Sequence, residues 1–161
     1  MVRQLISNIV VGISGSGASV HAAKYGIMMA KLYKCRLTAV YVVDTATIKQ
    51  LTMSKIFIAD ESRDFEVSLN ANGERYLAFV EELAKQKGVK MEKELRSGAV
   101  WSEILEAADE KKADLIILGG WEKDRNVKDI ISHVHHEILL HSKCSVVVVK
   151  EPEIDVLYRH L

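Results

Sequence analysis

The sequence predicts an α/β fold in which an open, twisted, parallel β-sheet carries helices on both faces. Five short stretches rich in β-branched residues alternate with stretches whose apolar residues recur at helical spacing, which indicates parallel crossover units. Most of the strand-like stretches are nearly continuously apolar, as is typical of parallel strands buried on both faces. The 161 residues amount to one ordinary domain, so we expect residues 1–161 to form a single domain.

The five strands are expected where the short apolar runs meet turn residues. The first run stops at glycines, the second at Asp44, and the fourth at Gly119 and Gly120. The third run alternates apolar with charged residues, as an edge strand with one wet face does. The predicted strands span residues 5–14, 35–43, 89–96, 114–118 and 145–149.

Four helices are expected between these strands. In each, apolar residues recur every three or four positions with polar residues between them. The predicted helices span residues 18–33, 61–87, 101–112 and about 129–141. Residues 44–60 hold apolar side chains without either period, so we expect a partly helical excursion over the surface there. Residues 151–161 are expected to form a tail.

Composition excludes several classes of protein. Lys plus Arg and Asp plus Glu number 22 each, and this balance argues against a general nucleic-acid-binding protein, which needs a basic face. No apolar run is long enough to span a bilayer, and the amino terminus does not resemble a signal peptide. We therefore expect a cytoplasmic protein without nucleic-acid or membrane partners. Cys35 and Cys144 are too few for a disulfide framework and are expected to be reduced core thiols.

The carboxyl ends of the strands are the place to look for a ligand, because open parallel sheets bind ligands in the crevice outside those ends. The ends fall at residues 12–17, 42–44, 97–100 and 118–121.

The loop over residues 14–19, Ser-Gly-Ser-Gly-Ala-Ser, leads from a predicted strand into a predicted helix. It nearly matches a dinucleotide-binding fingerprint, but Val20 stands where the third glycine or alanine belongs. Two interpretations stay open: the loop cradles an anion or nucleotide, or it is a tight turn in which Ser16 or Ser19 caps the helix. Asp44 similarly either contacts a ribose or caps the turn that follows it.

Taken together, these segments resemble the universal stress protein family over nearly the whole chain. The resemblance is carried by IVVGISGSGASVHAAKYG, VYVVD, SGAVWSEILEAADEKKADLIILGG and HVHHEILLHSKCSVVVVK. It implies a five-stranded parallel sheet in the order 3-2-1-4-5, Rossmann-like and similar to the adenine-nucleotide alpha-hydrolases, and usually a dimer. The strand with four consecutive valines would lie at an edge of that sheet, where pairing with the same strand of a second copy covers it.

Family members that bind ATP carry an Asp at the end of the first strand and Gly-x2-Gly-x9-Gly-(Ser/Thr) after the fourth. Here Gly119 matches the first glycine, but the later positions hold Glu122, Ser132 and His133, and Ser14 replaces the Asp. Glu122 would place a carboxylate beside phosphate oxygens, at a Coulomb cost of about 1 kcal/mol in water at 4 Å. The resemblance therefore favours the branch of the family that does not bind ATP.

Cationic side chains on the same loop keep a nucleotide site open as the alternative. Lys123, Arg125, Lys128 and His133 could hold an anion by a different geometry. The ligand would be ATP or AMP with Mg²⁺, with slow hydrolysis at most and no catalytic residue assigned. The candidate binding residues are Gly12, Ile13, Ser14, Gly15, Ser16, Gly17, Val42, Leu118, Gly119, Lys123, Arg125, Ser132, His133 and Val134.

Histidines cluster near the carboxyl terminus, and a metal site is one interpretation of this pattern. His133, Glu137 and His141 share one helical stripe, but eight residues of helix span about 12 Å, which is too long for one ion. We expect no metal there and interpret this cluster, which also holds His135 and His136, as a solvated or interface face. Trp121 either stacks on a base or covers the end of the sheet or a subunit contact.

The sequence is thus interpreted as a regulatory or binding module of the stress response that acts as a homodimer through residues 145–149. The tail over residues 151–161, with Val156, Leu157 and Tyr158, is expected to pack across that contact. An adenine-nucleotide sensor is the alternative function, and the protein partners stay unidentified.

Overall fold

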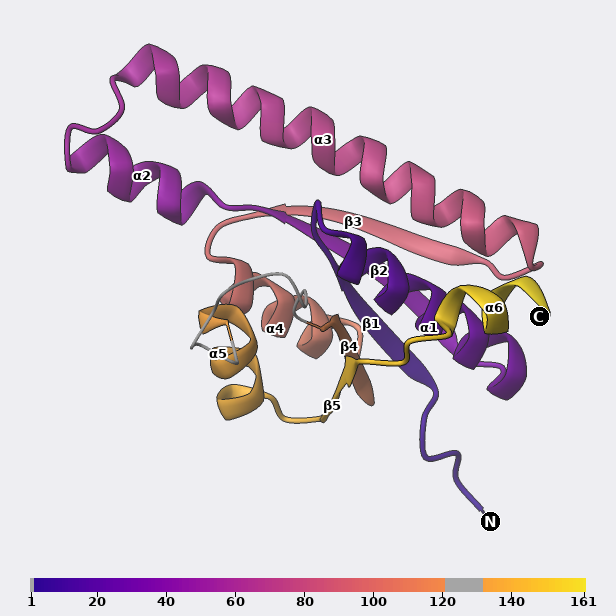
Figure 1. Cartoon of the computed structure of the whole chain (residues 1–161). Helices are drawn as coiled ribbons and strands as arrows, with labels where there is room; N and C mark the ends of the chain where they lie inside the picture. The colour runs from indigo at the N-terminus through magenta and orange to yellow at the C-terminus, as the bar shows by residue number, and fades with distance from the viewer. Residues whose placement is uncertain (1, 121–131) are drawn as a thin grey trace.

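The computed structural model describes residues 2–120 and 132–161, and it confirms the predicted sheet. Five parallel strands lie in the order β3-β2-β1-β4-β5 (Figure 1). The strands are β1 (Asn8–Ile13), β2 (Arg36–Val43), β3 (Met91–Ser97), β4 (Leu115–Gly119) and β5 (Ser145–Val149). Strand β1 is central: Val10 pairs with Thr38 of β2 on one side and with Ile116 of β4 on the other. The chain adds β2 and β3 on one side of β1 and then adds β4 and β5 on the other side, so the strand order reverses between β1 and β4.

Six helices lie in the described part of the chain. They are α1 (Gly17–Tyr33), α2 (Thr45–Met53), α3 (Ala59–Gln86), α4 (Val100–Glu110), α5 (His133–His141) and α6 (Ile154–Arg159). In this described part, no helix combines the length and the apolar character that a membrane span requires.

The two faces of the sheet carry different helices because successive strand residues point to opposite sides. Val11 and its neighbours of the same parity pack against α1, α3 and α6 in the larger core cluster. Val10 and Val40 face the other way and pack against Ile104 of α4 and Ile138 of α5. The sheet is therefore covered on both faces, as the continuous apolar runs predict.

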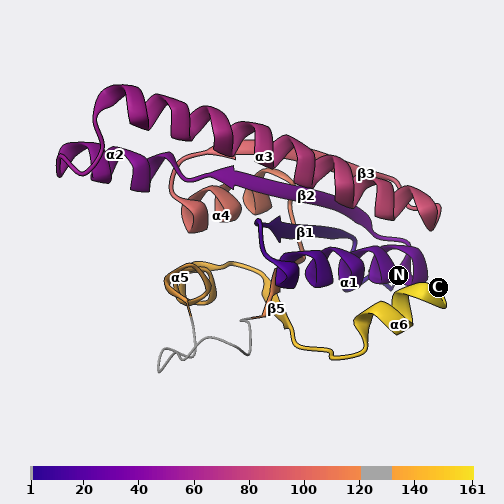
Figure 2. The same cartoon turned by 45° about the horizontal axis from the view of Figure 1, so that its top comes forward.

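Helix α3 is 28 residues long, and only part of it covers the sheet. Its crossing point is Gly73, where a Cβ atom would lie 2.6 Å from Cδ1 of Tyr41. The earlier turns extend with α2 beyond the strands (Figures 1 and 2). There Phe65 meets Phe57 edge-on, with ring centroids 5.7 Å apart. Residues 44–60 are partly helical, as predicted: they contain the whole of α2 and the start of α3.

Two predictions for the last part of the chain need correction. Helix α5 begins at His133, not near residue 129, because the extended backbone and side-chain hydroxyl of Ser132 form its N-cap; residues 129–131 lie outside the described residues. The tail forms helix α6, which lies beside α1 (Figure 2). Tyr158 was expected to pack across a subunit contact, but it is buried within its own chain and its hydroxyl donates to the Leu83 carbonyl at 2.6 Å.

Both cysteines are free thiols, as predicted, but the prediction that they lie in the core is wrong. Cys35 and Cys144 are half-buried at the margins of the two core clusters. The thiol of Cys35 donates to the Ile6 carbonyl at 3.3 Å. Burial, together with the nearby charge of Asp114, raises the pKa of Cys35, so this thiol is less reactive than an exposed one.

Candidate functional site

The loop between β1 and α1 is held together by its own serines. The hydroxyls of Ser14 and Ser16 lie 2.9 Å apart, and the Ser16 amide donates to the Ser14 hydroxyl at 3.3 Å. The Ser19 hydroxyl lies 2.7 Å from the Ser14 carbonyl and 2.9 Å from the Ser16 carbonyl. Hydroxyls that a ligand would otherwise use thus already hydrogen-bond within the loop.

The predicted capping role in this loop is confirmed, and Ser16 rather than Ser19 is the cap. Its side chain accepts from the Ser19 amide at 3.3 Å, and its backbone is extended, as an N-cap residue requires. Gly17 follows as the first helical residue, and a Cβ atom built there would meet nothing within 4 Å among residues 2–120 and 132–161. The start of α1 therefore combines a side-chain cap with a first residue that these residues leave uncovered, and the helix dipole favours an anion in such a place.

Gly119, the first position of the predicted phosphate pattern, has a packing role. A Cβ atom at Gly119 would lie 2.5 Å from both the carbonyl carbon and the oxygen of Ala18, and 2.8 Å from the Ser19 amide nitrogen. These are backbone atoms of the first turn of α1, so they cannot move aside as a flexible side chain would. The end of β4 can approach α1 only because residue 119 lacks a side chain.

Helix α5 is tied to the same strand end by His135. Its Nε2 lies 2.6 Å from the Gly119 carbonyl oxygen, and its Nδ1 contacts the hydroxyl of Ser132. Ser132 also accepts from the His135 amide at 3.2 Å. Because a carbonyl can only accept, we assign the proton to Nε2, which leaves Nδ1 to accept from Ser132. The starts of α1 and α5 thus converge on Gly119.

The remaining predicted residues of the strand ends are mostly part of the core. Ile13, Val42 and Leu118 are buried, and a Cβ atom at Gly12 would lie 3.1 Å from Leu118. Their side chains face the helices, so only their backbone groups could meet a ligand. His133 and Val134 form the first turn of α5, next to Ser132.

The predicted capping role of Asp44 is confirmed. Its carboxylate accepts from the Thr47 amide at 3.0 Å and from the Thr47 hydroxyl at 2.7 Å. These contacts make it the N-cap of α2; the periodicity of the segment did not reveal that a regular helix follows.

Tyr76 of α3 is a residue of this region that the sequence did not predict. A Cβ atom at Gly15 would lie 3.4 Å from the Tyr76 hydroxyl oxygen, so the phenol lies against the β1–α1 loop. The ring stacks on Tyr41 of β2 with centroids 6.2 Å apart. The hydroxyl of a tyrosine at a core-facing helical position usually needs a polar partner. This need was the one signal in the sequence that Tyr76 lies near a polar loop.

Several predicted loop residues lie outside the described residues. These are Trp121, Glu122, Lys123, Arg125 and Lys128.

The histidine cluster surrounds a glutamate. Glu137 carboxylate oxygens lie 3.3 Å from His141, 3.6 Å from His136 and 4.0 Å from His133. The ring of His141 also stacks on Trp101, with centroids 5.5 Å apart. Residues 2–120 and 132–161 contain no group of three or more His, Cys, Asp or Glu arranged to hold a metal ion.

Comparison with solved structures supports the observed fold. A universal stress protein in complex with cAMP superimposes with a TM-score of 0.66 at 22% identity, covering 89% of this chain and 96% of that chain. A universal stress protein family protein from Arabidopsis thaliana with AMP bound gives a TM-score of 0.64 at 15% identity, covering 92% and 94%. At these identities the likeness is one of fold alone.

Comparison of sequences goes further. The universal stress protein MJ0531 of Methanocaldococcus jannaschii is 33% identical over 152 residues, which cover 94% of this chain and 86% of that protein. The sequence model of the universal stress protein family matches residues 6–150. This match includes the serine loop, Gly119 and strand β5. The chain belongs to the universal stress protein family.

Proposed function

We propose that this protein is a regulatory binding module of the stress response that acts as a homodimer and does not turn over ATP. The observation that carries the proposal is that the strand-end residues already have structural roles. The hydroxyls of Ser14 and Ser16 hydrogen-bond to each other, and Gly119 packs against the first turn of α1. Other positions of the ATP-binding pattern are also replaced. Ser14 stands in place of the acidic residue, Glu122 and Ser132 in place of the later glycines, and His133 in place of the final Ser or Thr.

The homodimer is supported by the position and composition of β5. This strand lies at the end of the sheet, next to β4 alone. Its residues Val146, Val147 and Val148 are only half-buried in the single chain. An apolar edge strand tends to pair with another strand, and a two-fold axis through β5 would cover both edges at once.

We expect the Val148→Lys variant to be a monomer. Two added ammonium groups would face each other across the proposed two-fold contact, where like charges repel and must lose water. Sedimentation equilibrium should give twice the chain mass of 18.0 kDa for the native protein and the single mass for the variant. Val67→Lys is the matched control, because Val67 is 65% exposed on α3, far along the sheet from β5. A native protein that sediments as a monomer, or a dimeric Val148→Lys variant, would contradict the proposed interface.

An adenine nucleoside monophosphate is the second candidate, and the open start of α1 favours it. Among the described residues, nothing lies within 4 Å of a Cβ atom built at Gly17, and α5 starts beside the same strand end. A single phosphate needs only one or two helix amides, so the altered triphosphate pattern weighs less against it. The proteins of the same fold discussed above hold cAMP and AMP, which are both monophosphates.

Thermal melts separate the two candidates. If the carboxyl ends of the strands bind no nucleotide, neither ATP–Mg²⁺ nor AMP at millimolar concentration will change the melting temperature. If it holds a monophosphate, AMP at 100 times its dissociation constant will add about 2.7 kcal/mol, or a shift of roughly 5–11 °C. The shift should then disappear in Gly17→Leu, whose side chain fills the space above α1. A shift with ATP–Mg²⁺ alone would contradict both candidates.

A further inference from the structure

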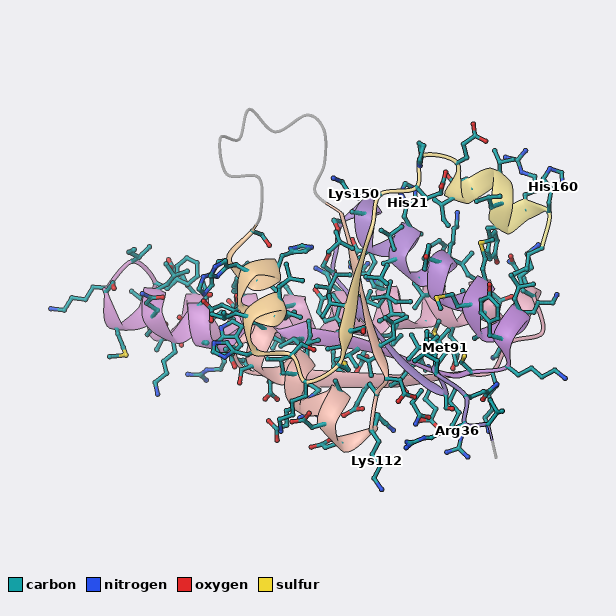
Figure 3. All side chains as sticks on the ribbon, turned by 90° about the horizontal axis from the view of Figure 1, so that it is seen from below. His21, Arg36, Met91, Lys112, Lys150 and His160 are labelled. Carbon is teal, nitrogen blue, oxygen red and sulfur yellow. The ribbon has the colours of Figure 1, made fainter. Side chains whose placement is uncertain are left out.

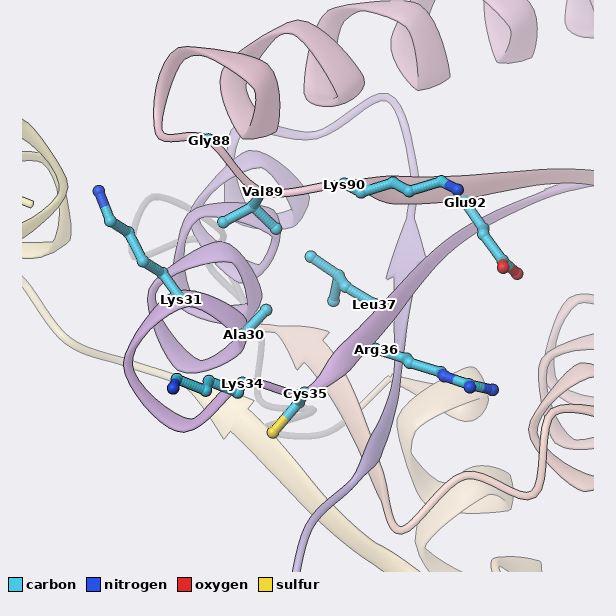
Figure 4. A pocket seen from close by; sticks show the side chains of 10 residues that line it. All are labelled: Ala30, Lys31, Lys34, Cys35, Arg36, Leu37, Gly88, Val89, Lys90 and Glu92. Atoms are coloured by element: carbon cyan, nitrogen blue, oxygen red, sulfur yellow. The ribbon is translucent and has the colours of Figure 1, made fainter.

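A hollow of about 640 Å³ lies at the opposite edge of the sheet, where β2 and β3 begin. It is bounded by the end of α1 and by the turn that follows α3 (Figure 4). Parallel strands place their amino ends together, so this edge is the length of a strand away from Ser14 and Gly119. Neither the family pattern nor the serine loop involves it.

Positive charge dominates the rim of this hollow. Figure 4 shows Lys31 and Lys34 on one side and Arg36 and Lys90 on the other. Among residues 2–120 and 132–161, no carboxylate oxygen lies within 4.0 Å of any of these four cationic groups. They are therefore free to bind an anion.

The one carboxylate of the rim, Glu92, is already engaged. It accepts from the Lys111 ammonium at 2.9 Å. The hydrogen bond and charge of Lys111 lower the pKa of Glu92, and the charges of Lys90 and Arg36 act in the same direction. A second, smaller hollow of about 310 Å³ shares Arg36 and Glu92 and adds Lys111 and Lys112. Figure 3 shows Arg36 and Lys112 on the same edge of the molecule.

The ends of the two adjoining helices do not account for these cations. Lysines near a helix carboxyl terminus often satisfy its last carbonyls. Here backbone amides take that role: Cys35 donates to Ala30 at 3.2 Å, and Val89 donates to Ala84 at 2.9 Å. The ammonium groups are left to the solvent.

The floor between the two charged sides is apolar. Ala30, Leu37 and Val89 are buried, and their side chains lie between the cationic pairs (Figure 4). We propose that this hollow binds a small phosphate monoester with an apolar or aromatic body. The body would lie on the floor, and the phosphate, which carries a charge of about −1.5 to −2 at pH 7, would meet the cationic rim.

The test is a titration of the ¹⁵N-labelled full chain with 1-naphthyl phosphate, followed by amide chemical shifts. We expect saturating shifts over residues 34–37 and 88–92, with a dissociation constant at or below about 1 mM. 1-Naphthol, which has the body without the charge, should bind at least about tenfold more weakly. 1-Naphthoate, which carries one charge, should fall between them.

Variants locate the site. Arg36→Gln combined with Lys90→Gln removes two exposed charges without touching the core, and should weaken 1-naphthyl phosphate binding at least about tenfold. Lys49→Gln is the matched control, because it removes one exposed charge on α2, away from the hollow, and should leave binding unchanged. Shifts centred on the β1–α1 loop, an unaffected double variant, or equal binding of 1-naphthoate would each overturn the assignment.

Discussion

The Gly119→Ala variant is expected to lose about 3 kcal/mol of unfolding free energy, near the upper end of what overpacking costs. The added methyl group would lie 2.5 Å from the carbonyl carbon and oxygen of Ala18. Relief requires β4 to move away from α1, and both belong to the larger core through Ile117, Ala22 and Ala23. A change of this size lowers the melting temperature of a 161-residue chain by roughly 6–12 °C.

Gly17→Ala is the control for this experiment. It makes the same chemical change on the other side of the same contact region, at a position where no described residue comes within 4 Å of the added Cβ atom. Alanine is preferred to glycine in helices by at most about 1 kcal/mol, so this variant should be as stable as the native protein or slightly more stable. Urea unfolding of both variants measures the difference. Equal stability of Gly119→Ala and the native protein would show that β4 and α1 separate easily, and the packing role of Gly119 would be wrong.

The result also bears on how glycine patterns are interpreted in this family. If Gly119→Ala destabilises the chain without any ligand, then a glycine at this position is required by packing alone. The first glycine of the phosphate pattern would then say little about nucleotide binding in this chain. The replaced positions, Ser14, Ser132 and His133, would carry the functional information instead.

The sheet could be predicted from the sequence because burial on both faces leaves a simple pattern. Short continuous apolar runs such as Leu115–Gly119 are typical of parallel strands that are buried on both faces. The order of strands required more than periodicity. Crossover rules allow several orders, and the order 3-2-1-4-5 came from the family resemblance.

The helical boundaries were less predictable because they depend on single polar contacts. Helix α2 is capped by Asp44 through the Thr47 amide and hydroxyl, and its sequence has only Ile48 buried. One buried residue leaves no period to detect. Helix α5 begins where Ser132 turns the backbone to an extended conformation, although the apolar spacing continues before it.

Long-range contacts could not be predicted at all. The Tyr158 hydroxyl reaches a carbonyl 75 positions earlier in the chain, and Tyr76 covers a loop some sixty positions before it. Neither contact has a local signature. The Ser14–Ser16–Ser19 network is different, because short side-chain to backbone bonds follow from the spacing itself, and there the capping alternative had been foreseen.

A second large effect is expected at Arg96, where one guanidinium serves four carboxylates. On the face of β3 that α4 covers, Arg96 Nη1 lies 2.5 Å from Glu94 and 3.0 Å from Glu110. Nε lies 3.4 Å from Glu103, and Nη2 lies 3.6 Å from Glu106. The side chain is only 13% exposed. Burial opposes its charge, but hydrogen bonds to Glu110 and Glu94 outweigh that effect and raise the pKa of Arg96 above its usual value.

The Arg96→Met variant is expected to lose about 3 kcal/mol of unfolding free energy at pH 7, because four carboxylates are then left facing one another without a counter-charge. Arg63→Met is the control: Arg63 is 76% exposed and pairs with Asp60 at 3.6 Å, so its loss should cost less than about 0.5 kcal/mol.

At lower pH, the unfolding free energies of Arg96→Met and the native protein should differ less than at pH 7. The protonated Glu106 carboxyl can donate a hydrogen bond to the Glu103 carboxylate, and this bond and the negative charge of Glu103 raise the pKa of Glu106 in the native chain. Even with Arg96 present, this carboxyl is therefore protonated more readily when folded than when unfolded. A group whose folded pKa is raised favours the folded state at low pH and loses that contribution as the pH rises through the folded pKa. In Arg96→Met the repulsion among the four carboxylates should act in the same direction, because their shared counter-charge is gone.

Urea unfolding at pH 7 and at about pH 4.5, close to the ordinary pKa of glutamate, tests this reasoning. The variant should regain stability relative to the native protein at the lower pH, where its glutamates take up protons and their repulsion falls. An equal loss at both pH values would mean that the aliphatic part of Arg96, packed between β3 and α4, matters more than its charge. The edge of the sheet would then be held by apolar contact, and the glutamates around it would be tolerated rather than required.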